Sequence, residues 1–418
     1  MTSVTAEARL APLHRQPLFL RFWSAQAVSV FGDQVSALAI PLTAVLVLHA
    51  SAFQVGLLTS MAWLPHLLFS LPAGLWIDAR PHRRHVMIGA DLLRAAALAT
   101  LPVAWWLGGV TVWQLLAVTF TVGALTVFFD LANASFVVAL VRRSQYVEAQ
   151  GRLSTSRSVS YIAGPSVAGF LVQALGAPVA LLADGASFLF SAFALGGTKV
   201  EEPPVEKSEH GSLRRLGDAF RHLLGDSLLR ASLLCTSTVN FFNFFLLAIF
   251  VLYASRTLGL SAGTIGVVLG VGAFGALVGA ITAPRIGRRL GIGRAVVIGA
   301  ILFPAPLALF PLAHGSHVVA GAMLLVGEFL ASVGVMIFDV NQNSVLAMSI
   351  PDALRSRIVG AYRFVNYGTR PVGALLGGVL GGAIGLRETM WISVAGSSAG
   401  VLFLLFSPMP GLREEHLA

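Results

Sequence analysis

The sequence predicts an all-α membrane protein with twelve transmembrane helices, six in each half of the chain, and three observations lead to this expectation. Hydrophobic residues make up 56% of the 418 residues and charged residues only 11%, with a mean hydropathy of +0.81. Apolar segments long enough to cross about 30 Å of hydrocarbon recur along the chain. The third observation is a long internal repeat, so the two halves are expected to share one structure.

The repeat joins two stretches that lie about half the chain apart. Phe129-Asp130-Leu131 with Ser135 returns 209 residues later as Phe338-Asp339-Val340 with Ser344. The second pattern, Arg157-x-Val159-x-Tyr161-x-x-x-Pro165, returns 206 residues later as Arg363-x-Val365-x-Tyr367-x-x-x-Pro371. A period of this length indicates a duplicated unit, not a solenoid of short repeats.

The helices are expected where apolar runs reach roughly 20 or more residues. These spans are 17–48, 54–78, 84–107, 111–141, 146–175, 177–198, 228–257, 262–284, 292–313, 315–348, 354–383 and 386–407. The first run is too long for a cleaved signal peptide, so it is expected to remain as a helix. The predicted organisation is a cytoplasmic tail, an N-terminal six-helix bundle, a cytoplasmic linker, a C-terminal six-helix bundle and a second cytoplasmic tail, at 1–16, 17–198, 199–226, 227–407 and 408–418.

Clusters of arginine give the orientation of the chain. They follow the even-numbered helices, whereas the loops after odd-numbered helices carry almost nothing basic apart from Arg256 and Arg387. By the positive-inside rule, both termini and the central linker are cytoplasmic, and the expected location is the plasma membrane. The net charge of +9 is therefore a topology signal, and no nucleic-acid partner is expected.

The central linker contains a pattern typical of an amphipathic helix. Apolar residues recur at helical spacing among arginines, at Leu213, Leu216, Phe220, Leu223 and Leu224. Such a helix would lie on the cytoplasmic membrane surface. The alternative is a solvated linker whose basic groups merely meet anionic lipid.

Several kinds of chemistry lack the residues they need. Neither Lys199 nor Lys207, the two lysines of the chain, stands in a phosphate-binding loop. The histidines are not joined by acids or cysteines at zinc spacing, and no Gly-x-Ser-x-Gly elbow occurs. The single cysteine, Cys235, sits in an apolar stretch and reads as a packing residue. We therefore expect neither an enzyme nor a bound cofactor or metal.

Asp33 is the first of several ionisable residues inside the apolar spans. A lone charge at the bilayer centre costs roughly 2.5–3.5 kcal/mol on insertion scales, so such residues usually face a partner or a watery cavity. No arginine is expected at the depth of Asp33 in this half of the chain. A carboxylate partly removed from water can exchange a proton near neutral pH, which suits proton coupling or binding of a cationic substrate. The alternative is that Gln34, Ser36 or a group on another helix supplies the hydrogen bonds that the Asp33 carboxylate needs.

Glu328 and Arg370 are expected at similar depth on neighbouring helices, each about 13 residues from the outer helix end. An ion pair between them that breaks when Glu328 is protonated would couple proton binding to rearrangement. The alternative is a static pair that allows both charges to be inserted.

The repeated acids and arginines lie nearer the cytoplasm. Asp130 with Arg157, and Asp339 with Arg363, could form two symmetric pairs of a cytoplasmic gate, or could be structural bridges within each half. Separately, Asp91 and Arg94 at i, i+3 are expected to form a local structural pair.

Two further sets of polar residues complete the list. Asp184 has no partner that the sequence identifies. Asn240, Phe241 and Asn243 place two amides beside aromatic surface, which could line an apolar binding cavity, although phenylalanines that face lipid are the commoner case.

Several motifs resemble the major facilitator superfamily. Gly74-Leu75-Trp76-Ile77-Asp78 followed by Arg83-Arg84 resembles its loop signature, with Ala79 and Pro81 in place of the usual basic residue and glycine. Ser160-x-x-x-Gly164-Pro165-x-x-Ala168-Gly169 resembles its antiporter motif, with Ser160 and Ala168 replacing glycines. Asn341-x-x-Ser344, Arg355-x-Arg357 and the stretch from Gly368 to Gly378 are similar to twelve-helix drug:proton antiporters that include macrolide and siderophore exporters.

The resemblance implies the major facilitator fold, two pseudo-symmetric six-helix bundles that rock about a central site in alternating access. It also implies export of lipophilic or amphipathic compounds in exchange for protons, with membrane lipids as further partners and a monomer as the expected state. Proton coupling is then assigned to Asp33, Glu328 and Arg370. The other expected roles are gating by Asp78, Arg83, Arg84, Asp130, Arg157, Asp339 and Arg363, substrate binding by Gln34, Asn240, Phe241 and Asn243, and helix kinks at Gly164, Pro165, Gly368 and Pro371.

The chain also departs from the superfamily pattern. The second-half counterpart of the loop signature, Gly279 to Arg289, has Ala283 where an acid would stand, and Val118 to Leu131 lack the usual basic residue of helix four. Two alternatives to export therefore stay open. One is proton-coupled uptake of a small nutrient, and the other is a membrane receptor or scramblase-like scaffold without transport.

Overall fold

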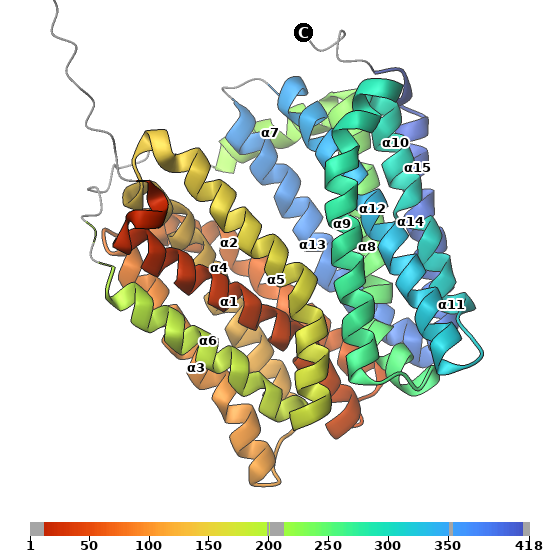
Figure 1. Ribbon diagram of the computed structural model, residues 1–418. Helices are drawn as coiled ribbons and strands as arrows, with labels where there is room; N and C mark the ends of the chain where they lie inside the picture. The colour runs from red at the N-terminus through yellow and green to blue at the C-terminus, as the bar shows by residue number, and fades with distance from the viewer. Residues whose placement is uncertain (1–11, 199, 201–212, 351–353, 413–418) are drawn as a thin grey trace, which may run out of the picture.

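Two successive sets of helices make up the chain in the computed structural model (Figure 1), which describes residues 12–198, 200, 213–350 and 354–412. No strand occurs among these residues. The first half consists of α1 (Pro17–Leu42), α2 (Ala52–Asp78), α3 (Arg83–Trp106), α4 (Val112–Leu140), α5 (Tyr146–Leu175) and α6 (Ala177–Gly196). The helices therefore begin and end within a few residues of the predicted spans.

The second half follows a short connecting helix, α7 (Leu213–Gly225). Its helices are α8 (Ser227–Leu252), α9 (Ala262–Leu290), α10 (Ile292–Leu302), α11 (Leu309–Leu312), α12 (His317–Ser349), α13 (Arg355–Ala383), α14 (Leu386–Ala399) and α15 (Val401–Leu405). The expected ninth span is divided between α10 and α11, because Pro304 and Pro306 stand between them. The expected twelfth span is divided between α14 and α15 at Gly400.

The two halves also repeat details of helix geometry and capping. A π-helical turn at Thr43–Val47 extends α1, and an equivalent turn at Tyr253–Thr257, 210 residues later, extends α8. The helices that follow are capped alike, since the Ser51 side chain accepts a hydrogen bond from the N–H of Gln54 and the Ser261 side chain from the N–H of Thr264. Each helix start is thus encoded locally and twice.

Eleven helical segments of the described chain are long and apolar enough to cross a membrane. The expected span that is not among these eleven is the eleventh along the chain, α13, which carries the arginines Arg355, Arg357, Arg363 and Arg370 and packs against α2 and α8. Together these segments make an all-α, multi-pass membrane protein with six spanning helices in each half.

The two halves meet along α2 with α13 and along α5 with α9. We call the end of the molecule that carries α7 the linker end, and the opposite end, where Ser51 and Ser261 start their helices, the far end. At the far end glycines let the backbones touch, because a Cβ added at Gly56 would lie 2.6 Å from the Cα of Gly378, and one at Gly266 would lie 3.0 Å from the Cα of Gly169.

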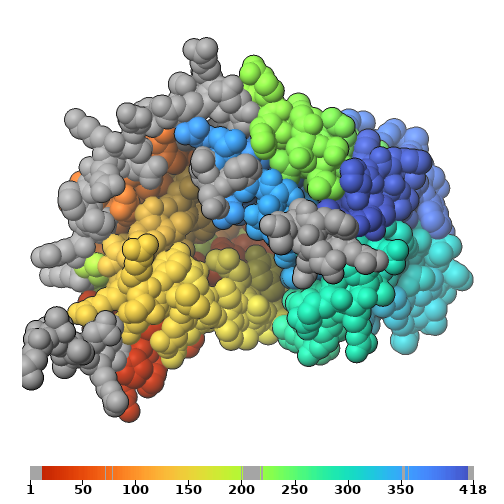
Figure 2. Space-filling model, turned by 90° about the horizontal axis from the view of Figure 1, so that it is seen from above, coloured from red at the N-terminus to blue at the C-terminus, as the bar shows by residue number. Residues whose placement is uncertain are grey.

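The halves diverge toward the linker end. On α5, Arg157 and Val159 are exposed near the linker end, whereas Gly169 is buried near the far end. The same change occurs along α13, from exposed Arg363 to buried Gly378. The helices α5 and α9 spread apart in Figure 1, and Figure 2, which looks onto the linker end, shows a hollow between the halves. A cleft between the halves therefore opens at this end.

The expected linker helix is present as α7. Its Leu223 is fully buried, and Phe220 packs with it in a cluster that includes Ile358 of α13. Most of the linker before α7, residues 199 and 201–212, and the side chains of Leu213 and Leu216 lie outside the described residues. The part of α7 that is described thus packs on the second half, and its contact with a membrane stays a prediction.

Candidate functional site

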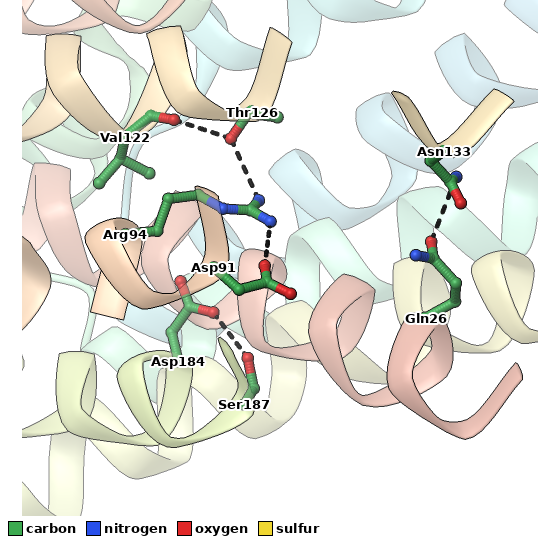
Figure 3. Close-up of polar contacts among 8 residues, drawn as sticks. All are labelled: Gln26, Asp91, Arg94, Val122, Thr126, Asn133, Asp184 and Ser187. Atoms are coloured by element: carbon green, nitrogen blue, oxygen red, sulfur yellow. Dashed lines mark hydrogen bonds and ion pairs between the residues drawn. The ribbon is translucent and has the colours of Figure 1, made fainter. Parts of the chain in front are cut away.

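A network of buried charges fills the centre of the first half (Figure 3). Asp91 and Arg94 of α3 form the expected i, i+3 ion pair, and both side chains are fully buried. Arg94 also donates a hydrogen bond to the Thr126 hydroxyl of α4 at 3.3 Å. Its guanidinium lies 4.4 Å from the ring centre of Phe129 and 4.1 Å from that of Phe188. The pair therefore joins α3 to α4 and α6.

Asp184 of α6, for which the sequence identified no partner, accepts hydrogen bonds from two serines. One is Ser36 of α1 and the other is Ser187 of α6, at 3.0 Å. Gly32 makes this possible, because a side chain at that position would collide with Ser187. The signal in the sequence was the small residue Gly32 and the hydroxyl of Ser36, both within three positions of Asp33.

Asp33 lies at the edge of this network and is partly exposed. It forms no hydrogen bond with any residue that the structure describes. The charges that act on it are, in decreasing order, those of Asp184, Arg94, Asp130 and Asp91. The expectation that no arginine lies near Asp33 was wrong, because α3 brings Arg94 to its depth. Gln34, next to it, packs on Gly164 of α5, where an added Cβ would lie 2.5 Å from the Gln34 Cβ.

The repeated charged residues lie exposed toward the linker end. Neither Asp130 with Arg157 nor Asp339 with Arg363 forms an ion pair in the described part of the chain, although Arg157 acts on Asp130 electrostatically. The arginine that acts on Asp339 is Arg370, not Arg363. The two symmetric ion pairs are therefore not formed among the described residues in this conformation.

The loop signature lies at the linker end of the first half. Asp78 is the last residue of α2 and Arg83 is the first of α3. Arg84 donates a hydrogen bond to the Thr198 carbonyl at 3.0 Å and so ties the start of α3 to the chain that leaves α6. Part of this signature is thus used to hold helices within one half together.

Glu328 of α12 lies in the interior of the second half. It borders a cavity of about 90 Å³ whose polar lining groups are Asn243, Ser332 and Glu328 itself. The apolar lining comprises Leu246, Leu247, Phe250, Leu269, Phe303, Leu307, Phe310 and Ala331. The expected ion pair of Glu328 with Arg370 is not formed among the described residues, because Glu328 turns toward Gly272 of α9. Glu328 also forms no hydrogen bond with them.

Arg370 of α13 points instead into a group of aromatic rings at the seam between the halves. Its guanidinium carbon lies 4.4 Å from the ring centres of both Trp63 of α2 and Tyr367 of α13, and 5.6 Å from that of Phe244. The ring of His66 lies 5.4 Å from that of Trp63. Sequence reasoning missed this group, although Tyr367 belongs to the repeated pattern.

The remaining expected site residues lie beside these features. Asn243 lines the Glu328 cavity, whereas Asn240 donates a hydrogen bond to the Thr236 carbonyl at 2.9 Å and Phe241 packs on Phe245 with ring centres 5.1 Å apart. Gly164 and Pro165 are buried in α5, and Pro371 is buried in α13. Gly368 faces α2, since an added Cβ would lie 3.2 Å from Leu67.

The sequence and the fold both have counterparts in known proteins. The sequence profile of the major facilitator superfamily matches residues 22–374. The multidrug efflux pump Tap of Mycobacterium tuberculosis is 26% identical over 433 residues, which cover 97% of this chain and 96% of Tap. Macrolide efflux protein A of Streptococcus pyogenes is 30% identical over 153 residues, 37% of each chain.

Solved structures agree with the profile on the fold. A mutant of the nucleoside transporter NupG superposes with a TM-score of 0.75 at 12% sequence identity, covering 93% of this chain and 99% of NupG. The profile match extends from α1 into α13 and so includes most of both halves. This chain therefore belongs to the major facilitator superfamily.

Proposed function

We propose that this chain is a secondary active transporter that exports lipophilic or amphipathic small molecules, such as drugs, antibiotics or natural products, in exchange for protons. The observation that carries the proposal is a carboxylate inside a spanning helix, Asp33 of α1, that is partly exposed and forms no hydrogen bond with the described residues, in a molecule whose halves are open at one end. Relatives named as multidrug and macrolide efflux proteins support export over uptake.

In this proposal the linker end faces the cytoplasm, as the arginine clusters favour. The first six-helix unit then comprises 17–198, the linker 199–226 and the second unit 227–407. The open cleft is the cytoplasm-facing state, in which substrate enters from the cytoplasm or the inner leaflet. Gln34, Asn240, Phe241 and Asn243 are proposed to contact it.

Asp33 and Glu328 are the proposed proton carriers. Each lies inside a spanning helix without an ion pair in the described chain, so a proton can be taken up without first breaking one. When the far end opens, protonation from outside neutralises Asp33 and weakens its attraction for a cationic group of the substrate. Each proton that returns inward gains about 2.3 kcal/mol per 100 mV of membrane potential.

Closure of the cleft would bring the exposed charges of the linker end together. We propose that Asp130, Arg157, Asp339 and Arg363 form their pairs only then, with Asp78, Arg83 and Arg84 beside them. The same groups would thus be apart in the open state and joined in the closed one. Gly164, Pro165, Gly368 and Pro371 are the proposed points at which α5 and α13 bend.

The test is efflux of lipophilic dyes and antibiotics from cells that express the chain, with and without a protonophore. Asp33→Asn and Glu328→Gln are compared with Glu148→Gln, which removes an exposed carboxylate that is paired with Arg152 on α5. We expect the wild type and Glu148→Gln to export, and the protonophore, Asp33→Asn or Glu328→Gln to abolish export.

The outcomes separate the parts of the proposal. Export that persists in both Asp33→Asn and Glu328→Gln would mean that the proton carriers are assigned to the wrong residues. A wild-type protein that is inserted in the membrane but moves nothing on the panel would argue against broad drug export. Accumulation of an external nutrient under a proton gradient would favour an importer.

A further inference from the structure

The Arg370 side chain is held in an unusual way for a cation inside a membrane protein. Its guanidinium carbon lies 4.4 Å from the ring centres of Trp63 and Tyr367, which come from different halves of the molecule. No carboxylate lies within ion-pair distance of it in the described part of the chain, and its buried Nε has no hydrogen-bond partner there. A charge at this depth normally has a partner.

This geometry leaves the N–H donors of the Arg370 guanidinium without a hydrogen-bond partner among the described residues. Aromatic rings attract a guanidinium through its flat face, whereas its N–H donors point outward in the plane of the group. Stacking on Trp63 and Tyr367 therefore fixes the orientation of the planar, fork-shaped guanidinium without using its N–H donors. Such a fork matches the two oxygens of a carboxylate or a similar anion.

The cluster formed by Arg370 and its neighbouring aromatic rings opens onto the cleft between the halves. Arg370 is only partly buried, and Asp339, which is exposed toward the linker end, acts on it electrostatically. Tyr161 of α5, half exposed, is acted on by Tyr367 of the second half and by Asp33 and Asp130 of its own half. The second half thus contributes Arg370 and Tyr367 to this region, and the first half contributes Trp63 and an acidic wall formed by Asp33 and Asp130.

From this juxtaposition we infer that Arg370 is a substrate-binding residue that takes an anionic group, and that the substrates include aromatic zwitterions. The acid group of the substrate pairs with the N–H donors of Arg370, its ring system packs beside Trp63 and Tyr367, and its cationic group faces the acidic wall. The inference rests on the proposed export function. A purely structural Arg370 would only tie α13 to α2.

Rhodamine B and its ethyl ester are matched probes, because they share one aromatic cation and only rhodamine B carries a free carboxylate. Their efflux is measured in proteoliposomes with an imposed proton gradient, at several dye concentrations. Wild-type protein is expected to export both dyes. Arg370→Gln should raise the half-saturating concentration of rhodamine B roughly tenfold to hundredfold, the usual value of a hydrogen bond to a charged group, and should leave the ester within about twofold.

Two further variants complete the design. Arg357→Gln removes an exposed arginine near the start of the same helix and is expected to leave the ratio of the two dyes unchanged. Arg370→Lys keeps the charge but loses the planar fork, so it should recover rhodamine B export only in part. Continued export of the ester in Arg370→Gln proves that this variant is folded and inserted.

The alternative outcomes are distinct. Equal losses of both dyes in Arg370→Gln would overturn the inference and make Arg370 a structural tie between the halves. Export of the ester but not of rhodamine B by the wild type would also overturn it, while the proposed export function would stand. Export of neither dye by the wild type would overturn both.

Discussion

The two halves of the molecule share their backbone and differ in their buried charges. Equivalent backbone positions lie 209 or 210 residues apart, as the π-helical turns at Thr43–Val47 and Tyr253–Thr257 and the left-handed glycines Gly176 and Gly385 establish. The Arg157–Pro165 pattern, which returns after 206 residues, is three residues out of this register. At this spacing the charged residues inside the first half correspond to neutral residues in the second. Asp33 corresponds to Asn243, Asp91 to Ala300, Arg94 to Phe303 and Asp184 to Ser393.

This difference in buried charges determines which side chains fill the interior of each half. Where the first half holds the Asp91–Arg94 ion pair and the bonds of Asp184, the second half has Phe303 and Asn243 on the wall of a cavity of about 90 Å³. Glu328, the lone carboxylate at this cavity, corresponds to Thr119, whose hydroxyl donates to the Leu115 carbonyl within its own helix. One duplicated backbone therefore supports a satisfied polar core in one half and a nearly apolar, imperfectly filled core in the other.

The largest expected effect comes from giving the first half one residue of the second. Arg94→Phe leaves Asp91 buried without its cation, and breaking a buried ion pair in this way costs about 3–5 kcal/mol. We expect a large fall in the thermal stability of the purified protein in detergent. The measurement is the melting temperature, followed by loss of folded protein on size-exclusion chromatography.

Two companion variants make this result specific. Asp91→Ala combined with Arg94→Phe copies Ala300 and Phe303 and should regain most of the lost stability. Arg152→Gln, which breaks only the exposed pair with Glu148, should cost less than about 1 kcal/mol. If the double variant were no more stable than Arg94→Phe, the comparison of the two halves would be wrong, because Arg94 would then be needed for its own packing on Phe129 and Phe188.

The second prediction concerns the close glycine contacts that occur at both seams between the halves. Gly56 faces Gly378 across one seam, and its equivalent Gly266 faces Gly169 across the other. Gly56→Ala and Gly266→Ala should each destabilise the closed far end by about 1–3 kcal/mol, which shifts the conformational equilibrium about 5- to 150-fold. The measured quantity is the distance between spin labels on the far ends of α2 and α13, which should lengthen.

The matched control for the seam is Gly89→Ala on α3. Nothing lies within 4 Å of the Cβ that this change adds, so the label distance should stay as in the wild type. Because Cys235 is fully buried, introduced cysteines can be labelled selectively. A lengthened distance in only one of the two seam variants would contradict the expected symmetry.

The third prediction contrasts the carboxylates of the two cores. Glu328→Leu replaces a group without a hydrogen bond in the described chain by an apolar one in a mainly apolar cavity, so stability should stay level or rise by about 1 kcal/mol. Asp184→Leu should instead cost about 1–3 kcal/mol, because Ser36 and Ser187 lose their acceptor. Melting temperatures of the two variants, measured side by side, should move apart. A fall for Glu328→Leu as large as that for Asp184→Leu would mean that Glu328 has a stabilising role.

The fold could be read from the sequence because its signals are local and repeated. Long apolar runs give the spans, Ser51 and Ser261 start helices through their own side chains, and the duplicated patterns relate the halves. The division of the ninth span at Pro304 was not foreseen, although proline marks such points. The conformation was not predictable either, since the far-end contact depends on glycines such as Gly56 and Gly378 that meet only in three dimensions.

The site was less predictable for a physical reason. Depth along a helix can be estimated from the sequence, but the direction in which a side chain points cannot. Glu328 and Arg370 were expected to pair because their depths match, yet one turns to Gly272 and the other to Trp63. Asp91 and Arg94 were predicted correctly because positions three apart on a helix always share a face.

The smallest expected effect tests the comparison at a single backbone position. His49 has a φ of +50° and its equivalent Gly259 a φ of +64°, and His49 is the one non-glycine residue of the described chain in this region. Left-handed backbone costs a side chain about 1–2 kcal/mol, so Gly259→Ala should lower stability by about that amount. His49→Gly relieves the same strain but adds freedom to the unfolded chain, and the two terms should leave a change below about 1 kcal/mol. A fall in melting temperature for His49→Gly as large as that for Gly259→Ala would mean that the two turns are not equivalent.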